Sequence, residues 1–113
     1  MSLGKRLAAK RQSKRTRIEV AEWGEDAPLE IFSSFLNCGD VEKLQRKHPN
    51  FITNATIAAM VDLIILKAED KDGEKLFTLE DKPFLMREPV SLISAIAGQM
   101  FATVESVDSL GND

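Results

Sequence analysis

The sequence predicts an α+β fold that is predominantly α-helical, with a short N-terminal β-hairpin followed by about four helices. Three observations predict it: apolar and polar residues alternate after residue 17, turn-forming residues interrupt that stretch, and apolar residues recur at helical spacing from residue 40 onward. The 113 residues suit one domain with a modest core. We expect a flexible basic arm over 1–17, a globular domain over 18–105 (hairpin 18–33, helices 40–104) and a frayed tail over 106–113.

Two short apolar stretches on either side of a turn predict the hairpin. In the first stretch Ile18 and Val20 flank an acid, and Trp23 closes it. The segment 24–28 supplies a glycine and a proline for the turn, and 29–32 is the candidate partner strand. Because a two-stranded hairpin is only marginally stable alone, it must pack on helices or pair with another chain. An exposed strand edge makes Ile18 and Val20 candidates for a self-association surface.

Capping residues mark the start of the helical region. Asp40 is expected to N-cap a short helix over Val41–His48, which Pro49 ends. His48 is the only histidine, and no second ligand or nucleophile stands at a recognisable spacing from it. We therefore expect neither a catalytic nor a metal-binding role for His48. Asn54 is expected to N-cap the next helix.

The helix expected over 55–69 is the most apolar element of the chain. Apolar residues form one stripe at helical spacing and cover a second sector beside it. Such a helix is either central in the core or shared between the core and a partner. We take Met60, Leu63 and Leu66 as the candidate partner surface. The stripe comprises Ile57, Met60, Val61, Ile64 and Ala68, and the second sector comprises Ala59, Leu63 and Leu66.

Two more helices are expected toward the C-terminus. Thr78 can cap a short helix toward Met86, with Asp81 in the capping-box position, although Pro83 can also mark the first turn of a helix that starts later. The final helix begins after Pro89 and faces the core. Its apolar face carries Ile93, Ile96, Ala97, Met100, Phe101 and Val104, and its opposite face carries Ser91, Ser94 and Gln99.

The segment from Asp70 to Asp81 resembles a calcium-binding loop but lacks its essential ligands. Aligning Gly73 with the glycine of an EF-hand loop puts Ala68 at the first ligand position and Leu79 at the last. Neither side chain coordinates a hard cation, so we expect no metal here. The segment is better explained as a polar turn between two helices.

Charge is distributed unevenly along the chain. Residues 1–17 hold seven basic residues and no acid, which leaves eight of the 15 basic residues against 18 acids in 18–113. The arm therefore carries +7 and the body −10. Basic clusters can bind nucleic acid, but this arm lacks aromatic residues for stacking and the acidic body repels a polyanion. We expect a solvated arm, or one that folds back on the body or a second subunit, with no nucleic-acid partner. Its charges are Lys5, Arg6, Lys10, Arg11, Lys14, Arg15 and Arg17.

Several classes of function are not expected. The longest apolar run carries Asp62 and Lys67 and is shorter than the roughly 20 residues of a membrane helix, so no membrane association is expected. No apolar stretch follows the basic residues of the N-terminus, so we expect no secretory signal there, and the single cysteine, Cys38, suits a reducing cytoplasm. There is no phosphate-binding loop, nucleophile elbow or CxxC pair. We expect no enzyme activity and no cofactor.

The order of the elements resembles that of the tail assembly chaperones of long-tailed, siphovirus-type bacteriophages. The resemblance spans roughly residues 18–104 and rests on three features: Ile18–Gly24 followed by Leu29–Ile31, the helical middle, and the Asp70–Asp81 segment. It implies a non-enzymatic protein of the host bacterial cytoplasm that is absent from the mature virion. The basic arm departs from the family pattern.

The resemblance also implies partners. Such chaperones bind and solubilise the long tape measure protein and recruit tail tube subunits, and a longer form often arises by ribosomal frameshifting. Coating a long client calls for many copies, so we expect a homo-oligomer. The alternatives are a small nucleic-acid-binding regulator that uses the basic arm, and a structural phage tail or head-completion protein.

Overall fold

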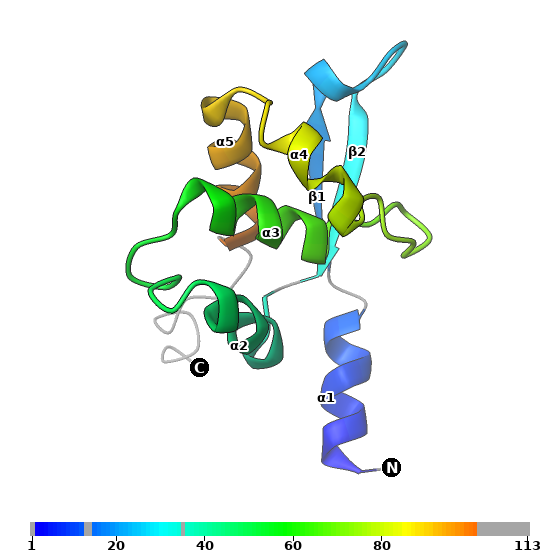
Figure 1. The fold of residues 1–113 in the computed structure, drawn as a ribbon. Coiled ribbons are helices and arrows are strands. Elements are labelled where there is room, and N and C mark those ends of the chain that lie inside the picture. The colour runs from blue at the N-terminus through cyan, green and yellow to red at the C-terminus, as the bar shows by residue number, and fades with distance from the viewer. Residues whose placement is uncertain (1, 13–14, 35, 102–113) are drawn as a thin grey trace, which may run out of the picture.

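The computed structural model describes residues 2–12, 15–34 and 36–101. An antiparallel hairpin is followed by four α-helices, which confirms the predicted fold class (Figure 1). None of the helices in the described residues is long and apolar enough to span a bilayer. The elements are α1 (Leu3–Gln12), β1 (Arg15–Val20), β2 (Leu29–Ser34), α2 (Cys38–Lys47), α3 (Ile57–Lys67), α4 (Lys82–Leu85) and α5 (Val90–Phe101), with short 3-10 turns η1 (Ala21–Trp23) and η2 (Leu79–Asp81).

The hairpin places its apolar side chains on one face. Ile18 pairs with Ile31 across the two strands, and both side chains are buried together with Val20. Because strand side chains alternate between faces, the charged residues of β1 fall on the opposite, exposed face. Trp23, which we expected to close the strand, lies in η1 instead. The turn requires Gly24, since a Cβ there would lie 1.8 Å from the carbonyl oxygen of Ala27.

This packing corrects our interpretation of Ile18 and Val20 as a self-association surface. Their side chains are 1% and 3% exposed and belong to the core of the folded chain. The hairpin is stabilised by packing on the helices, which was the first of the two expected solutions. The outer edge of β2 is also occupied, because Phe32 exchanges backbone hydrogen bonds of 2.8 and 2.9 Å with Glu69.

The predicted N-caps of α2 and α3 are wrong by three and two positions. Asn37, rather than Asp40, caps α2: its Oδ1 accepts from the backbone N–H of Asp40, whose carboxylate accepts from the N–H of Asn37. The helix therefore begins at Cys38. Thr56, rather than Asn54, caps α3 through a 3.2 Å bond from the N–H of Ala59. Asp40 lies inside α2 and Asn54 lies two residues before the cap of α3, whereas Asn37 and Thr56 have the extended backbone and the oxygen that an N-cap needs.

The most apolar helix, α3, crosses the centre of the molecule (Figure 1). It contacts α5, α2, α4 and β2. Ala59, Val61, Leu63 and Ile64 are almost completely buried. The helix is thus central in the core, while Ile57 at its first turn is 46% exposed and Leu66 near its end is half-buried.

The final helix, α5, begins at Val90 directly after Pro89, as predicted. It buries Ile93, Ile96, Ala97 and Met100. Phe101 stays at the rim and packs on Phe51 with ring centroids 5.3 Å apart. Val104 and the tail over 106–113 lie outside the described residues.

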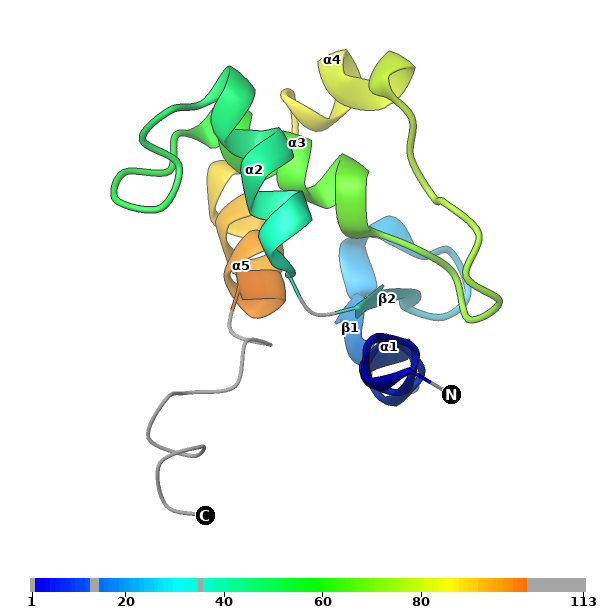
Figure 2. The ribbon, with the colours of Figure 1, turned by 90° about the horizontal axis from the view of Figure 1, so that it is seen from below.

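The N-terminal arm contains an element that the sequence did not predict. Residues 3–12 form α1, which projects from the hairpin end of the molecule (Figures 1 and 2). β1 begins at Arg15, three residues before the expected boundary. Arg15 and Arg17 therefore belong to the hairpin and not to an arm that precedes it.

Candidate functional site

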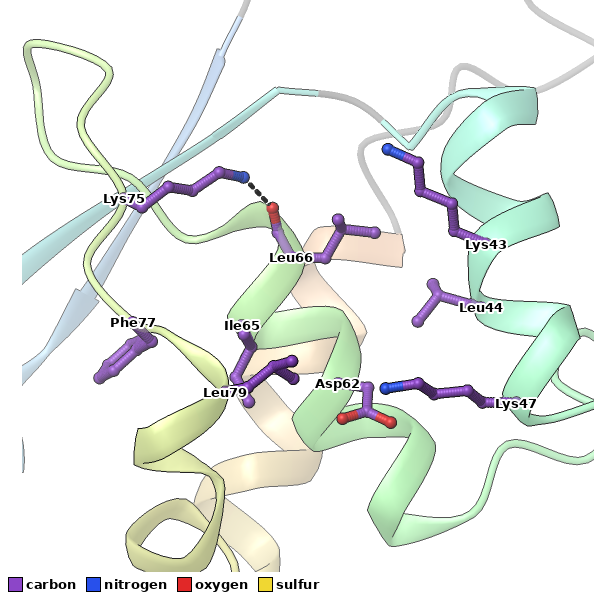
Figure 3. A pocket seen from close by; sticks show the side chains of 9 residues that line it. All are labelled: Lys43, Leu44, Lys47, Asp62, Ile65, Leu66, Lys75, Phe77 and Leu79. Carbon is purple, nitrogen blue, oxygen red and sulfur yellow. Dashed lines mark hydrogen bonds between the residues drawn. The ribbon is translucent and has the colours of Figure 1, made fainter.

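A groove opens on the surface between α2, α3 and the segment 75–79 (Figure 3). It has a volume of about 340 Å³, near the lower end of the usual range for ligand sites. α3 forms its floor, α2 forms one wall, and the chain that leads into η2 forms the other. We call it the lysine-rimmed groove; its lining residues are Lys43, Leu44, Lys47, Asp62, Ile65, Leu66, Lys75, Phe77 and Leu79.

The middle of the groove is apolar. Leu44 and Ile65 are buried beneath it, while Leu66 and Phe77 are half-buried. Leu79 is 63% exposed, and it stands at the wall opposite α2. The apolar floor and the exposed leucine at its edge leave hydrocarbon in contact with water. A bound partner would remove this apolar surface from water.

Three lysines surround this apolar floor. Lys43 and Lys47 extend from α2, one helical turn apart, and Lys75 comes from the opposite wall, where its ammonium donates to the carbonyl of Leu66 (Figure 3). The body of the chain, 18–113, has eight basic residues and 18 acids. Three of those eight line the groove, against one of the acids. The groove is therefore locally basic on an acidic body.

The one acid, Asp62, lies at an end of the groove within a cluster of polar side chains. Its Oδ2 is 2.7 Å from Nε2 of His48, and the Nζ of Lys82 lies 3.0 Å from Oδ1. Burial raises the pKa of Asp62, but the hydrogen bonds to His48 and Lys82 and the charges of Lys82 and Lys47 outweigh it, so the pKa is lowered. Asp62 is therefore a fixed negative charge at neutral pH.

The cluster suits charge compensation better than proton transfer. A general acid or base needs a pKa near the working pH, and the pKa of Asp62 moves away from it. His48 lies at the C-terminal end of α2 and reaches across to α3, so the pair joins the two helices. The histidine for which the sequence suggested no partner thus has one.

The segment 70–81 folds as the polar turn that the sequence indicated. The carboxylate of Asp70 accepts from the backbone N–H groups of Asp72 and Glu74, at 2.8 and 3.0 Å. Gly73 takes φ +87°, which favours glycine. The carboxylate of Asp81 accepts from the N–H of Thr78, and η2 then continues into α4 with Pro83 in its first turn. The turn positions the groove wall that follows it.

Arg15 holds this turn against the hairpin. Its guanidinium donates to the carbonyl oxygens of Asp70 and Lys71 at 3.1 and 2.7 Å and lies 5.0 Å above the ring of Phe32. Arg17 pairs with Glu19 and Glu30 on the outer face of the sheet. Both guanidinium groups therefore make contacts within the folded domain.

The other charges of the predicted electrostatic arm have separate positions. Lys5 and Arg6 lie exposed on α1. Lys10 and Arg11 belong to the same helix, but their side chains are not among those described, and Lys14 lies outside the described residues.

The candidate partner surface of α3 is divided by the fold. Leu66 lines the groove, and Met60 is half-buried where the hydroxyl of Ser94 approaches its sulfur at 3.7 Å. Leu63 is 1% exposed, so its assignment to a surface is corrected. A helix apolar on two sides has no sequence signal to tell which sector a neighbouring helix covers.

Sequence reasoning missed the other groove residues because they come from separate segments. Leu44 and Lys47 stood out only as parts of a short helix, and Phe77 and Leu79 only as parts of a connector. The helical spacing of Lys43 and Lys47, four residues apart beside Leu44, was the sequence signal of an amphipathic surface on this helix. No protein-family model matches the chain, and neither do the curated proteins or the solved structures with which it was compared.

Proposed function

We propose that this protein is a non-enzymatic phage tail assembly chaperone, which binds and solubilises the tape measure protein and helps recruit tail tube subunits during tail morphogenesis. The observation that carries the proposal is the lysine-rimmed groove, since a chaperone for a long helical client needs exposed apolar surface of limited size. The element order, hairpin, helical middle and Asp70–Asp81 turn, supports the same family resemblance.

The rival function, a nucleic-acid-binding regulator, has less support. Arg15 and Arg17, two of the seven arm charges, are engaged in contacts within the fold. Fewer charges for phosphate contacts mean a weaker counterion-release contribution to binding. We therefore keep the arm outside the proposed client site.

The proposal is tested by co-expression with the very long open reading frame expected downstream of this gene. The client should aggregate alone and become soluble with the chaperone, and the two should elute together from a sizing column. A client that stays insoluble, or a soluble client that elutes without the chaperone, contradicts the proposal.

Two further observations belong to the same proposal. The protein would act in the host bacterial cytoplasm as a homo-oligomer and be absent from the finished particle, so mass spectrometry of purified virions should not detect it. A stoichiometric amount in virions would instead favour the structural tail or head-completion protein. A slippery heptamer before the stop codon would support a frameshifted longer form.

A further inference from the structure

We propose that the lysine-rimmed groove binds one amphipathic α-helical segment of the partner, whose apolar stripe is flanked by carboxylates. The inference rests on the proposed function, because it names the chemistry of the client at the chaperone's site. The inference can be tested separately from the chaperone function, because a model peptide can supply the same kind of helix.

The shape of the groove favours a helix. Its floor is the helix α3, and its walls are α2 and the segment 75–79 (Figure 3). The groove is open to solvent along its top and is not an enclosed cavity. Helix-in-groove binding uses apolar anchors spaced three or four residues apart, which reach the floor while the rest of the helix stays outside. The exposed Leu79 would cover one side of such an anchor.

The charges of the groove select acidic flanks. Lys43 and Lys47 lie on one wall and Lys75 on the other, so carboxylates on both sides of an apolar stripe would meet ammonium groups. Opposite charges across an interface contribute mainly to specificity and association rate. The remainder of the body has an excess of acids, so the net charge outside the groove disfavours an acidic helix.

Asp62 restricts where the carboxylates of the partner helix can lie. Its carboxylate is 7% exposed, lies at the floor and is compensated by His48 and Lys82. A second carboxylate placed on the floor would face this charge in a partly desolvated site, which is costly. The acids of the partner helix must therefore lie at the rim, beside the lysines, and not on the buried stripe.

The test uses two labelled helical peptides of about 18 residues, long enough to form a stable helix on binding. Both carry the same leucine stripe, and their flanking positions are glutamate in one and lysine in the other. Fluorescence anisotropy with the full chain should give a dissociation constant at least about tenfold lower for the glutamate peptide at low salt, and the difference should shrink with added salt.

Variants locate the binding to the groove. Lys43→Glu/Lys47→Glu should weaken binding of the glutamate peptide by about tenfold or more, as two attractive contacts become repulsive. Arg46→Glu/Arg87→Glu makes the same change in net charge at exposed residues that do not line the groove, and it should leave the affinity unchanged. Circular dichroism confirms that both variants are folded.

Three results overturn the inference. The first is equal affinity for the two peptides, and the second is an equal loss of affinity for the glutamate peptide in the two double variants. The third is no binding of either peptide while a fluorescent fatty acid binds, because that result assigns the groove to an anionic amphiphile. If the long client still co-elutes with the protein in any of these cases, the chaperone function survives and only the helix chemistry fails. If the glutamate peptide binds but the client does not, the chaperone function fails alone.

Discussion

At the scale of single residues, Asp62 shows how this small domain keeps a carboxylate inside the fold. The side chain sits on α3, the most buried helix, and burial alone would favour its neutral form. His48 from the end of α2 and Lys82 from the start of α4 supply hydrogen bonds and charge. Because these partners come from different helices, the ionised Asp62 joins α2, α3 and α4.

This arrangement predicts a pH dependence of stability. The pKa of Asp62 is lowered in the folded state, so its contribution is complete above the unfolded pKa of about 3.9 and is lost as the pH falls through the folded value below it. Asp62→Asn should reduce the free energy of unfolding by about 2 kcal/mol at pH 7. Urea titrations should show that the difference from the wild type begins to shrink only as the pH falls below about 4 and disappears below the folded pKa of Asp62.

Asp26→Asn provides the control for that experiment, because it removes a carboxylate from the exposed 24–28 turn. Its unfolding curve should follow that of the wild type at pH 7. A difference between wild type and Asp62→Asn that persists unchanged to low pH would contradict the role assigned to the Asp62 cluster.

Two leucines on α3 should respond differently to the same substitution. Leu63 is 1% exposed, so Leu63→Glu buries a charge without a partner and should unfold a domain whose total stability is about 5–15 kcal/mol. Leu66 is half-buried in the groove, so Leu66→Glu should fold and destabilise by about 1 kcal/mol. Circular dichroism with thermal melting measures both; a folded Leu63→Glu variant would contradict the position of Leu63 in the core.

At the scale of elements, the start of α2 combines a cap with an ion pair. The carboxylate of Asp40 accepts from the N–H of Asn37 and from the ammonium of Lys67 at 2.8 Å. Lys67 is buried and also donates to Ser34. The Asp40 carboxylate thus completes the capping box of α2 and compensates a buried charge at the end of α3.

Two substitutions separate these roles. Asn37→Ala removes only the cap and should cost about 1 kcal/mol of stability. Asp40→Ala also leaves Lys67 buried without its counter-ion and should cost about 3 kcal/mol. Adding Lys67→Met to Asp40→Ala should restore part of the loss, as measured by denaturant unfolding. Equal costs for Asn37→Ala and Asp40→Ala would show that the ion pair contributes nothing.

The elements themselves follow largely from local sequence signals. The alternation of Ile18 and Val20 predicted the hairpin, although β1 begins three residues earlier. The capping box at Thr78 and Asp81 and the proline before α5 predicted the last helices. The N-caps of α2 and α3 were displaced, because Asn37 and Thr56 compete with Asp40 and Asn54, and backbone geometry decides between such neighbours. The helix α1 was not expected, since clustered like charges indicate a solvated arm.

At the scale of the whole molecule, the groove is a product of tertiary structure. Its walls come from α2 and the segment 75–79, which are far apart in the sequence and meet only across α3. Arg15 helps to fix the second wall by holding the turn at Asp70 and Lys71 against the hairpin. Periodicity identified α3 as an unusual helix, but it could not identify the surface that α3 shares with its neighbours.

The groove is tested most directly as the client site by the soluble fraction of the proposed client, the tape measure protein, when it is co-expressed with groove variants. Leu66→Glu, in the groove, should leave most of the client insoluble, since a charge replaces apolar contact area. Ile52→Glu changes a residue that is 59% exposed and does not line the groove, and it should keep the client as soluble as the wild type does. If folded Leu66→Glu solubilises the client as well as Ile52→Glu, the lysine-rimmed groove is not the client site.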